Sequence, residues 1–140
     1  MILLDTNVIS EILRPQPEIR VLNWLKAQPR EEFWTCSVVI AELLSGIEGM
    51  PTGTKQGILR EAVEAMVTED FRGQVVNFDL DAARHFGTIV ATRRRMGRPI
   101  GGIDAQIAAC ARKCGAQLAT RNVRNFVDCG IQVVKPWEEN

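Results

Sequence analysis

Met1-Ile2-Leu3-Leu4-Asp5-Thr6-Asn7 joins an apolar run directly to polar residues that can begin a helix. The run from Ile2 to Leu4 is apolar on every side, which is typical of a strand buried on both faces of a parallel sheet. Thr6 or Asn7 can cap a short helix that follows at once. The stretch therefore predicts a buried parallel strand, a helix, and an acid, Asp5, at the junction between them.

The same alternation of strand and helix continues along the chain. Asp79 is expected to cap a long helix that Gly97 and Pro99 end, Ser37 to cap an earlier one, and Gly115 to end a later one. Alternating strands and helices predict a three-layer α/β/α fold around a central, mostly parallel sheet of about five strands. The further strands are expected at residues 33–36, 74–78, 117–120 and 131–134.

The composition is that of an ordinary globular protein. The 140 residues are 46% apolar and carry no formal net charge, so only local patches can attract nucleic acid. Without a linker or a low-complexity tract, residues 1–140 are expected to form a single domain. Because no stretch approaches the roughly 18 apolar residues of a membrane span, we expect a cytoplasmic protein without membrane contact. The scattered cysteines and the single histidine argue against a zinc site and predict free, largely buried thiols.

Three acids that are far apart in the chain lie where apolar sequence turns into helix. Asp5 follows the first strand, Glu42 lies within the apolar residues 37–44, and Asp104 lies in the first turn of a predicted helix. In parallel α/β folds the functional crevice lies at the carboxyl ends of the strands, where these acids can meet. Carboxylates within ~4 Å repel by roughly 1–4 kcal/mol per pair. Mg²⁺ or Mn²⁺ would remove this repulsion and could activate water for phosphodiester hydrolysis.

Each acid also has a purely structural interpretation. Asp5 can be a helix cap, and Asp104 can simply favour the positive end of its helix, a contribution of about 0.3–1 kcal/mol. Glu42 is harder to explain in this way, because a charge among apolar residues must point out of the buried face or have a partner. The residues alone leave both interpretations open. They do exclude a two-histidine ribonuclease site, since the chain has one histidine and no tyrosine.

Arginines follow the predicted long helix and precede the Asp104 segment. Arg93, Arg94 and Arg98 can be a solvated helix terminus or a clamp for RNA phosphates. Arg121 can bind RNA nearer the acids. The three tryptophans are expected to pack or to serve an interface, rather than to stack on bases.

Four segments of the chain form a recognisable ordered set: residues 4–11, 41–43, 103–109 and 118–122. Together they resemble the PIN domain, and most closely the VapC/FitB-like ribonuclease toxins of bacterial type II toxin–antitoxin systems. The resemblance covers essentially the whole chain. It implies a Mg²⁺- or Mn²⁺-dependent endoribonuclease, a hydrolase that is usually a homodimer. It also implies a VapB/FitA-like cognate antitoxin that binds operator DNA, forms a hetero-oligomer with the toxin and covers the active site.

Residue by residue, the resemblance assigns metal binding to Asp5, Glu42 and Asp104. It assigns catalysis to these acids together with Asn122. Thr6, Asn7 and Thr120 are expected to support the acids through hydrogen bonds.

The chain departs from the family pattern at Asn122, where many members carry a fourth acid. The amide can still orient water, but a second metal ion should bind more weakly. Two alternatives therefore stay open beside the ribonuclease: a PIN-fold protein that binds RNA or a partner without cutting, and a nuclease for single-stranded or flap DNA.

Overall fold

Strand β1 (Ile2–Leu4) lies at the centre of a five-stranded sheet in the computed structural model, which describes residues 1–138. The strand order is β3-β2-β1-β4-β5, and all four pairings are parallel. The predicted parallel sheet of about five strands is thus confirmed. The other strands are β2 (Phe33–Cys36), β3 (Val75–Val76), β4 (Gln117–Ala119) and β5 (Val133–Val134).

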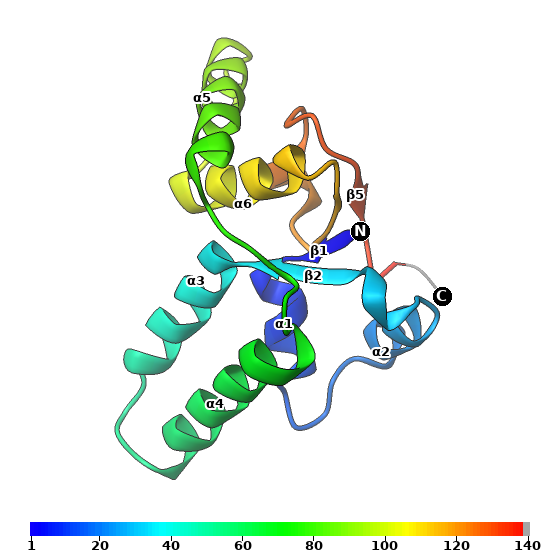
Figure 1. Ribbon diagram of the computed structural model, residues 1–140, viewed down its shortest axis with the longest axis vertical. Coiled ribbons are helices and arrows are strands. Elements are labelled where there is room, and N and C mark those ends of the chain that lie inside the picture. The colour runs from blue at the N-terminus through cyan, green and yellow to red at the C-terminus, as the bar shows by residue number, and fades with distance from the viewer. Residues whose placement is uncertain (139–140) are drawn as a thin grey trace.

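Helices cover both faces of this sheet, as predicted for three α/β/α layers. Figure 1 shows α5 and α6 on one side of the strands, with α1, α2, α3 and α4 on the other. A π-helical turn, η2 (Met66–Asp70), continues α4. The helices are α1 (Thr6–Ile12), α2 (Ile19–Lys26), α3 (Ser37–Glu48), α4 (Thr54–Ala65), α5 (Leu80–Arg95) and α6 (Gly102–Lys113), and two 3₁₀ turns are η1 (Arg30–Glu32) and η3 (Val123–Phe126).

The central strand is buried on both faces, as its sequence predicts. Leu3 and Leu4 are at most 1% exposed, because helices pack on either side of them. On α6 the buried face is made largely of alanine, so that α5 and the sheet can approach it closely. Close packing of this kind fixes α6, and with it the acid in its first turn.

The structure corrects two predicted helix caps and confirms two other helix signals. Asp5, not Thr6 or Asn7, caps α1. Cys36, not Ser37, precedes α3. Elsewhere, Asp79 caps α5 and Gly115, with a φ of 62°, ends α6, as expected.

The cysteines are free thiols, as predicted, and three of the four are buried. No helix in residues 1–138 is long and apolar enough to cross a bilayer.

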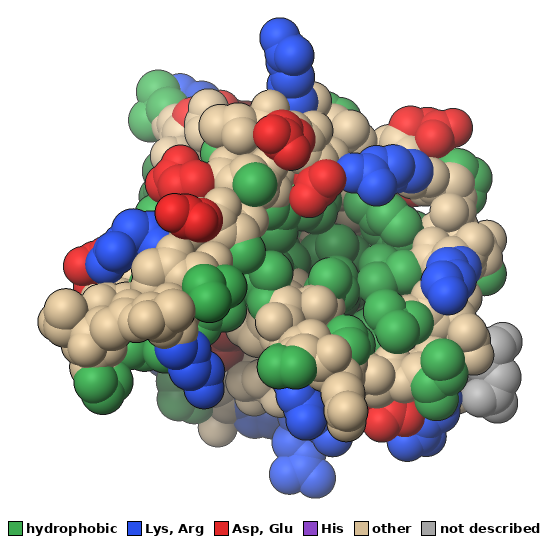
Figure 2. Space-filling model, turned by 90° about the horizontal axis from the view of Figure 1, so that it is seen from below, with side chains coloured by type: hydrophobic (Ala, Val, Ile, Leu, Met, Phe, Trp, Pro, Cys, Tyr) green, Lys and Arg blue, Asp and Glu red, His purple; other side chains and the backbone are tan. Residues whose placement is uncertain are grey.

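A hollow lined by apolar side chains opens on the face formed by α1, α2 and η2. Figure 2 shows this green hollow with basic and acidic side chains around its rim. Its volume is about 580 Å³, and its apolar lining includes Ile9, Ile12, Leu13, Leu25, Phe33, Met66 and Phe71.

Candidate active site

The structure brings the three predicted acids to one cavity of about 470 Å³. Asp5 reaches it from the junction of β1 and α1, Glu42 from α3, and Asp104 from the first turn of α6. The order in which strands are added reverses between β1 and β4. Strands β2 and β3 lie on one side of β1, and the chain then returns to add β4 and β5 on the other side. The cavity therefore lies at the switch in strand order, the position expected for a functional crevice.

Hydrogen bonds fix Asp5 from both of its carboxylate oxygens. Oδ1 accepts from the backbone N–H of Thr6 at 2.8 Å. Oδ2 accepts from the hydroxyl of Thr120 at 2.7 Å and from the amide of Asn7 at 3.2 Å. The hydroxyl of Thr120 also accepts from Asn7 at 3.2 Å and from the backbone N–H of Asn122 at 3.0 Å. Thr120 thus joins the ends of β1 and β4 into one network.

The other two acids are half-buried and have partners of their own. Glu42 accepts a hydrogen bond from the hydroxyl of Thr6, which ties α3 to the start of α1. Asp104 accepts one from the amide of Asn125 at 3.1 Å. Each of the three carboxylates therefore has at least one neutral donor.

The acids also perturb one another. Burial raises the pKa of Asp5, hydrogen bonds from Thr120 and Thr6 oppose the rise, and the charges of Asp104 and Glu42 add to it. Burial likewise raises the pKa of Asp104, and the charge of Glu42 raises it further. No lysine or arginine in the described part of the chain forms a salt bridge with any of the three. The three carboxylates therefore share the cavity without a directly paired cation, although the charge of Arg93 lowers the pKa of Asp104.

The carboxylate oxygens of this cavity suit Mg²⁺ or Mn²⁺ better than a metal ion that needs all of its ligands from the protein. Among residues 1–138, no three acidic, histidine or cysteine side chains are already gathered around a common point. Mg²⁺ does not need such a cage, because it keeps several waters and takes one or two carboxylates. Asp5, Asp104 and Glu42 are the carboxylates of this cavity that have no salt-bridge partner among the described residues, since Glu11 pairs with Arg14.

Glu11 and Arg14 line the cavity beside Asn7, and reasoning from the sequence gave these two residues no role. Glu11 is buried, and its Oε2 accepts from Arg14 Nη1 at 2.9 Å and from the backbone N–H of Glu18 at 3.2 Å. Counting in helical steps from Asn7 could have identified both, since Glu11 follows on the same face of α1 and Arg14 comes just after the end of that helix at Ile12. Asn125 gave no comparable pattern, because it meets Asp104 from a distant 3₁₀ turn.

The prediction that Arg93 clamps RNA phosphates was wrong. Its side chain is buried at 6% exposure and binds main-chain carbonyls instead. Nε donates to Arg98 O at 2.7 Å, and Nη1 donates to Asn125 O at 2.7 Å and Val127 O at 3.0 Å. The guanidinium thus holds the end of α5 against the loop that carries Asn125.

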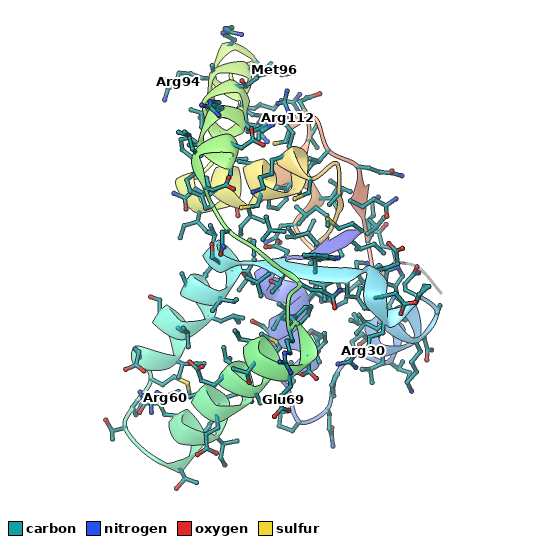
Figure 3. All side chains as sticks on the ribbon, viewed as in Figure 1. Arg30, Arg60, Glu69, Arg94, Met96 and Arg112 are labelled. Carbon is teal, nitrogen blue, oxygen red and sulfur yellow. The ribbon has the colours of Figure 1, made fainter. Side chains whose placement is uncertain are left out.

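The remaining arginines lie in different surroundings. Figure 3 places Arg94 at the free end of α5, away from the sheet. Arg98 pairs with Asp128 at 2.9 Å. Neither lines the cavity of the acids, whereas Arg121 does. Of the predicted RNA-binding residues, Arg121 is therefore the one that the fold places beside the acids.

Replacing Arg93 by Met should lower the free energy of unfolding by about 3 kcal/mol, because three partly buried carbonyls lose a charged donor. Urea denaturation measures this loss. Arg94→Met, an exposed change on the same helix, should stay within about 0.5 kcal/mol of the parent. Equal effects of the two changes would show that Arg93 has no structural role.

A parallel sheet that brings acids from β1, α3 and α6 to its switch point defines a PIN-like α/β protein. The PIN domain family model matches residues 2–129, and the chain belongs to this family. Its curated relatives include the VapC ribonuclease Y4jK of Sinorhizobium fredii, which is 38% identical over 138 residues, 99% of each chain. The toxin FitB of Neisseria gonorrhoeae is 36% identical over 139 residues, 99% of this chain and 100% of FitB.

Solved structures agree with this assignment. The FitAB complex bound to an IR36 DNA fragment superposes with a TM-score of 0.92 at 35% identity, covering 100% of this chain and 98% of that one. DNA-bound VapBC from Salmonella typhimurium gives a TM-score of 0.81 at 27% identity, covering 96% and 97%. The fold and the family of the chain are therefore those of the VapC/FitB toxins.

Proposed function

We propose that this chain is the toxin of a bacterial toxin–antitoxin pair, an endoribonuclease that hydrolyses RNA phosphodiester bonds with Mg²⁺ or Mn²⁺. The proposal rests on the cavity in which Asp5, Glu42 and Asp104 meet, since no lysine or arginine among the described residues forms a salt bridge with any of the three. The relatives named as VapC ribonuclease and toxin support the choice of RNA and of a toxic activity.

The residues of the cavity have distinct parts in this proposal. Asp5 and Asp104, with Glu42 directly or through water, would hold the ion, which supplies Lewis acidity toward the phosphate. Thr120 keeps Asp5 in place through its 2.7 Å hydrogen bond. Asn122 can orient a water through its amide, and its neutrality leaves one charge fewer for a second ion than an acid would.

The proposed partners are a cognate VapB/FitA-like antitoxin and a second copy of the chain. The protein is proposed to act in the cytoplasm. Related toxins have been solved as FitAB and VapBC complexes with DNA, which supports an antitoxin that carries the operator-binding activity. The apolar hollow beside α1 and α2 offers such an antitoxin a surface to cover (Figure 2). Large exposed apolar surfaces of this kind often mark protein interfaces.

Asn122 supports a second candidate, a PIN-fold protein that binds RNA or a partner without cutting it. Apart from Glu11, which pairs with Arg14, the described part of the cavity has three acids beside the amide of Asn122, where a further acid would help to hold a second ion. This protein would bind metal normally and leave every RNA pool intact.

Purified chain should cleave single-stranded RNA when Mg²⁺ or Mn²⁺ is present, and a chelator should stop the reaction until excess metal is restored. The matching DNA strand serves as the control and should remain whole. Metal binding with no cleavage of any RNA pool would favour the second candidate, and preferential cleavage of the DNA would indicate a DNA nuclease. In cells, expression should arrest growth, and co-expression of the cognate antitoxin should relieve the arrest.

A further inference from the structure

Arg121 and Trp137 form a cationic part of the cavity wall. The guanidinium carbon of Arg121 lies 5.1 Å from the centre of the Trp137 ring, within the range of a cation–π contact. Both residues line the cavity that also contains Asp5 and Asp104. An arginine stacked on an indole therefore stands beside the acids.

The charge of Arg121 is held near the acids but is not neutralised by them. In the part of the chain that the structure describes, no carboxylate oxygen lies within 4.0 Å of its guanidinium. Its backbone N–H donates to Asn7 Oδ1 at 3.1 Å, and Asn7 also donates to Asp5. The main chain of Arg121 is thus fixed relative to Asp5, while its cationic end stays available to an anion.

Trp137 gives an independent indication that this part of the cavity takes a ligand. The side chain is only 8% exposed, and its indole N–H has no hydrogen-bond acceptor within residues 1–138. A buried N–H without an acceptor is costly and is rare in native proteins. Trp137 lines the cavity but its N–H is covered, so a bound strand can supply the missing acceptor once the ring turns toward the cavity.

We propose that Arg121 and Trp137 form the subsite for an RNA phosphate next to the one that is cleaved. Arg121 binds the phosphate oxygens, and its planar guanidinium suits such an anion. Trp137 is a positioning residue, because its ring holds the guanidinium in place and its N–H faces the same strand on binding. This inference rests on the proposed ribonuclease function and adds to it a phosphate site whose cation comes from the protein.

RNA binding by a cleavage-deficient protein tests the subsite separately from catalysis. Fluorescence anisotropy of a labelled single-stranded oligoribonucleotide is measured with Asp104→Asn protein in Mg²⁺. Adding Arg121→Gln should weaken binding about 10–100-fold, as for a hydrogen bond to a charged group. The salt dependence should also fall, by about 0.7 in the slope of log K against log salt, since one phosphate contact is lost. Arg121→Lys should retain this slope and recover part of the affinity.

Trp137→Phe should weaken binding about tenfold and leave the salt slope unchanged, because the ring remains while the N–H and part of the cation–π attraction are lost. Trp24→Phe is the matched control: it also removes a buried indole, from α2, and should leave binding unchanged. In cleavage-competent protein, Arg121→Gln and Trp137→Phe should raise KM more than they lower kcat.

Unchanged affinity and salt slope in Arg121→Gln would overturn the subsite, as would equal losses in Trp137→Phe and Trp24→Phe. If Trp137→Phe does not fold, the Gln and Lys variants of Arg121 decide the question. If the parent protein cleaves RNA but the affinity for RNA does not depend on Arg121, the subsite is wrong and the ribonuclease function stands. If the parent protein cleaves no RNA but its affinity for RNA depends on Arg121, the ribonuclease function is wrong and the subsite stands.

Discussion

Asp104→Asn should slow RNA cleavage by more than about 100-fold, since changing even the partners of metal ligands typically costs 10–100-fold. Asp5→Asn should have an equally large effect. The amide keeps the size of the carboxylate but removes the charge that would attract Mg²⁺. Initial rates at saturating RNA, measured over a range of Mg²⁺ concentrations, test this expectation. Asp81→Asn is the matched control, because Asp81 is an exposed acid in the first turn of another helix, α5.

The same substitution should stabilise the metal-free protein near neutral pH. Burial and the charge of Glu42 raise the pKa of Asp104 above its ordinary value in the folded chain. The folded state therefore binds more protons than the unfolded state between the two pKa values, and the free energy of unfolding falls as pH rises through that window. Near pH 7 the ionised Asp104 is thus unfavourable, and removing its charge should raise the free energy of unfolding by less than about 1 kcal/mol, since solvent screens a half-exposed carboxylate.

This gain should fade as the pH falls from the raised pKa of the folded chain to the ordinary pKa of the unfolded chain, and it should be gone below about 4, where the carboxyl is protonated in both states. The difference in stability between Asp104→Asn and the parent can be measured by thermal unfolding in the presence of a chelator, since each kcal/mol shifts the midpoint by about 2–4 °C. Added Mg²⁺ should stabilise the parent more than Asp104→Asn. Rapid RNA cleavage by Asp104→Asn, or a loss of stability near neutral pH, would show that Asp104 is a structural acid rather than a metal ligand.

The sheet was predictable because its determinants are local. The apolar run before Asp5 is too short for a helix and has no polar side, so it specifies a strand buried on both faces. The strand Phe33–Cys36 was also predicted at the residues where it occurs, although only its last two residues are fully buried. The convergence of the acids then followed from the carboxyl-end rule for parallel strands, without knowledge of any side-chain contact.

Arg93 shows where the reasoning from the sequence stopped too early. Ala82, Phe86 and Ile89 lie on one apolar stripe of α5, and the next position on that stripe is Arg93. Extending the helical period by one turn would have placed this arginine inside. Its three carbonyl acceptors could not have been predicted, because they depend on the path of a loop that begins some 30 residues later.

Trp137 and Asn125 mark the part of the site that the sequence does not encode locally. Each meets its partner across a long separation in the chain, Trp137 at Arg121 and Asn125 at Asp104. Neither lies on a periodic helix face that points to the acids. Long-range polar contacts of this kind depend on how η3 and the C-terminal segment pack against β4, and this packing is known only from the folded structure.

Thr120→Val should lower the rate of RNA cleavage by about 10–100-fold, because it removes the hydroxyl that holds Asp5. Thr120 is fully buried, and its one hydroxyl donates to Asp5 and accepts from Asn7 and from the backbone of Asn122. Valine has nearly the same shape, so the change removes hydrogen bonds without opening a cavity. We expect weaker Mg²⁺ binding and a free energy of unfolding lower by about 1–3 kcal/mol.

Two further variants separate a positioning role for Thr120 from a purely structural one. Thr120→Ser keeps the hydroxyl and should recover most of the cleavage rate. Thr35→Val removes another fully buried threonine hydroxyl, which bonds to Leu4 O at 3.4 Å from the neighbouring strand β2 and does not line the cavity. It should lose stability but keep its rate when folded. If Thr35→Val slows cleavage as much as Thr120→Val does, the effect comes from a general loss of sheet stability. If only Thr120→Val slows cleavage, the carboxylate of Asp5 must be held at one angle for the chemistry to proceed.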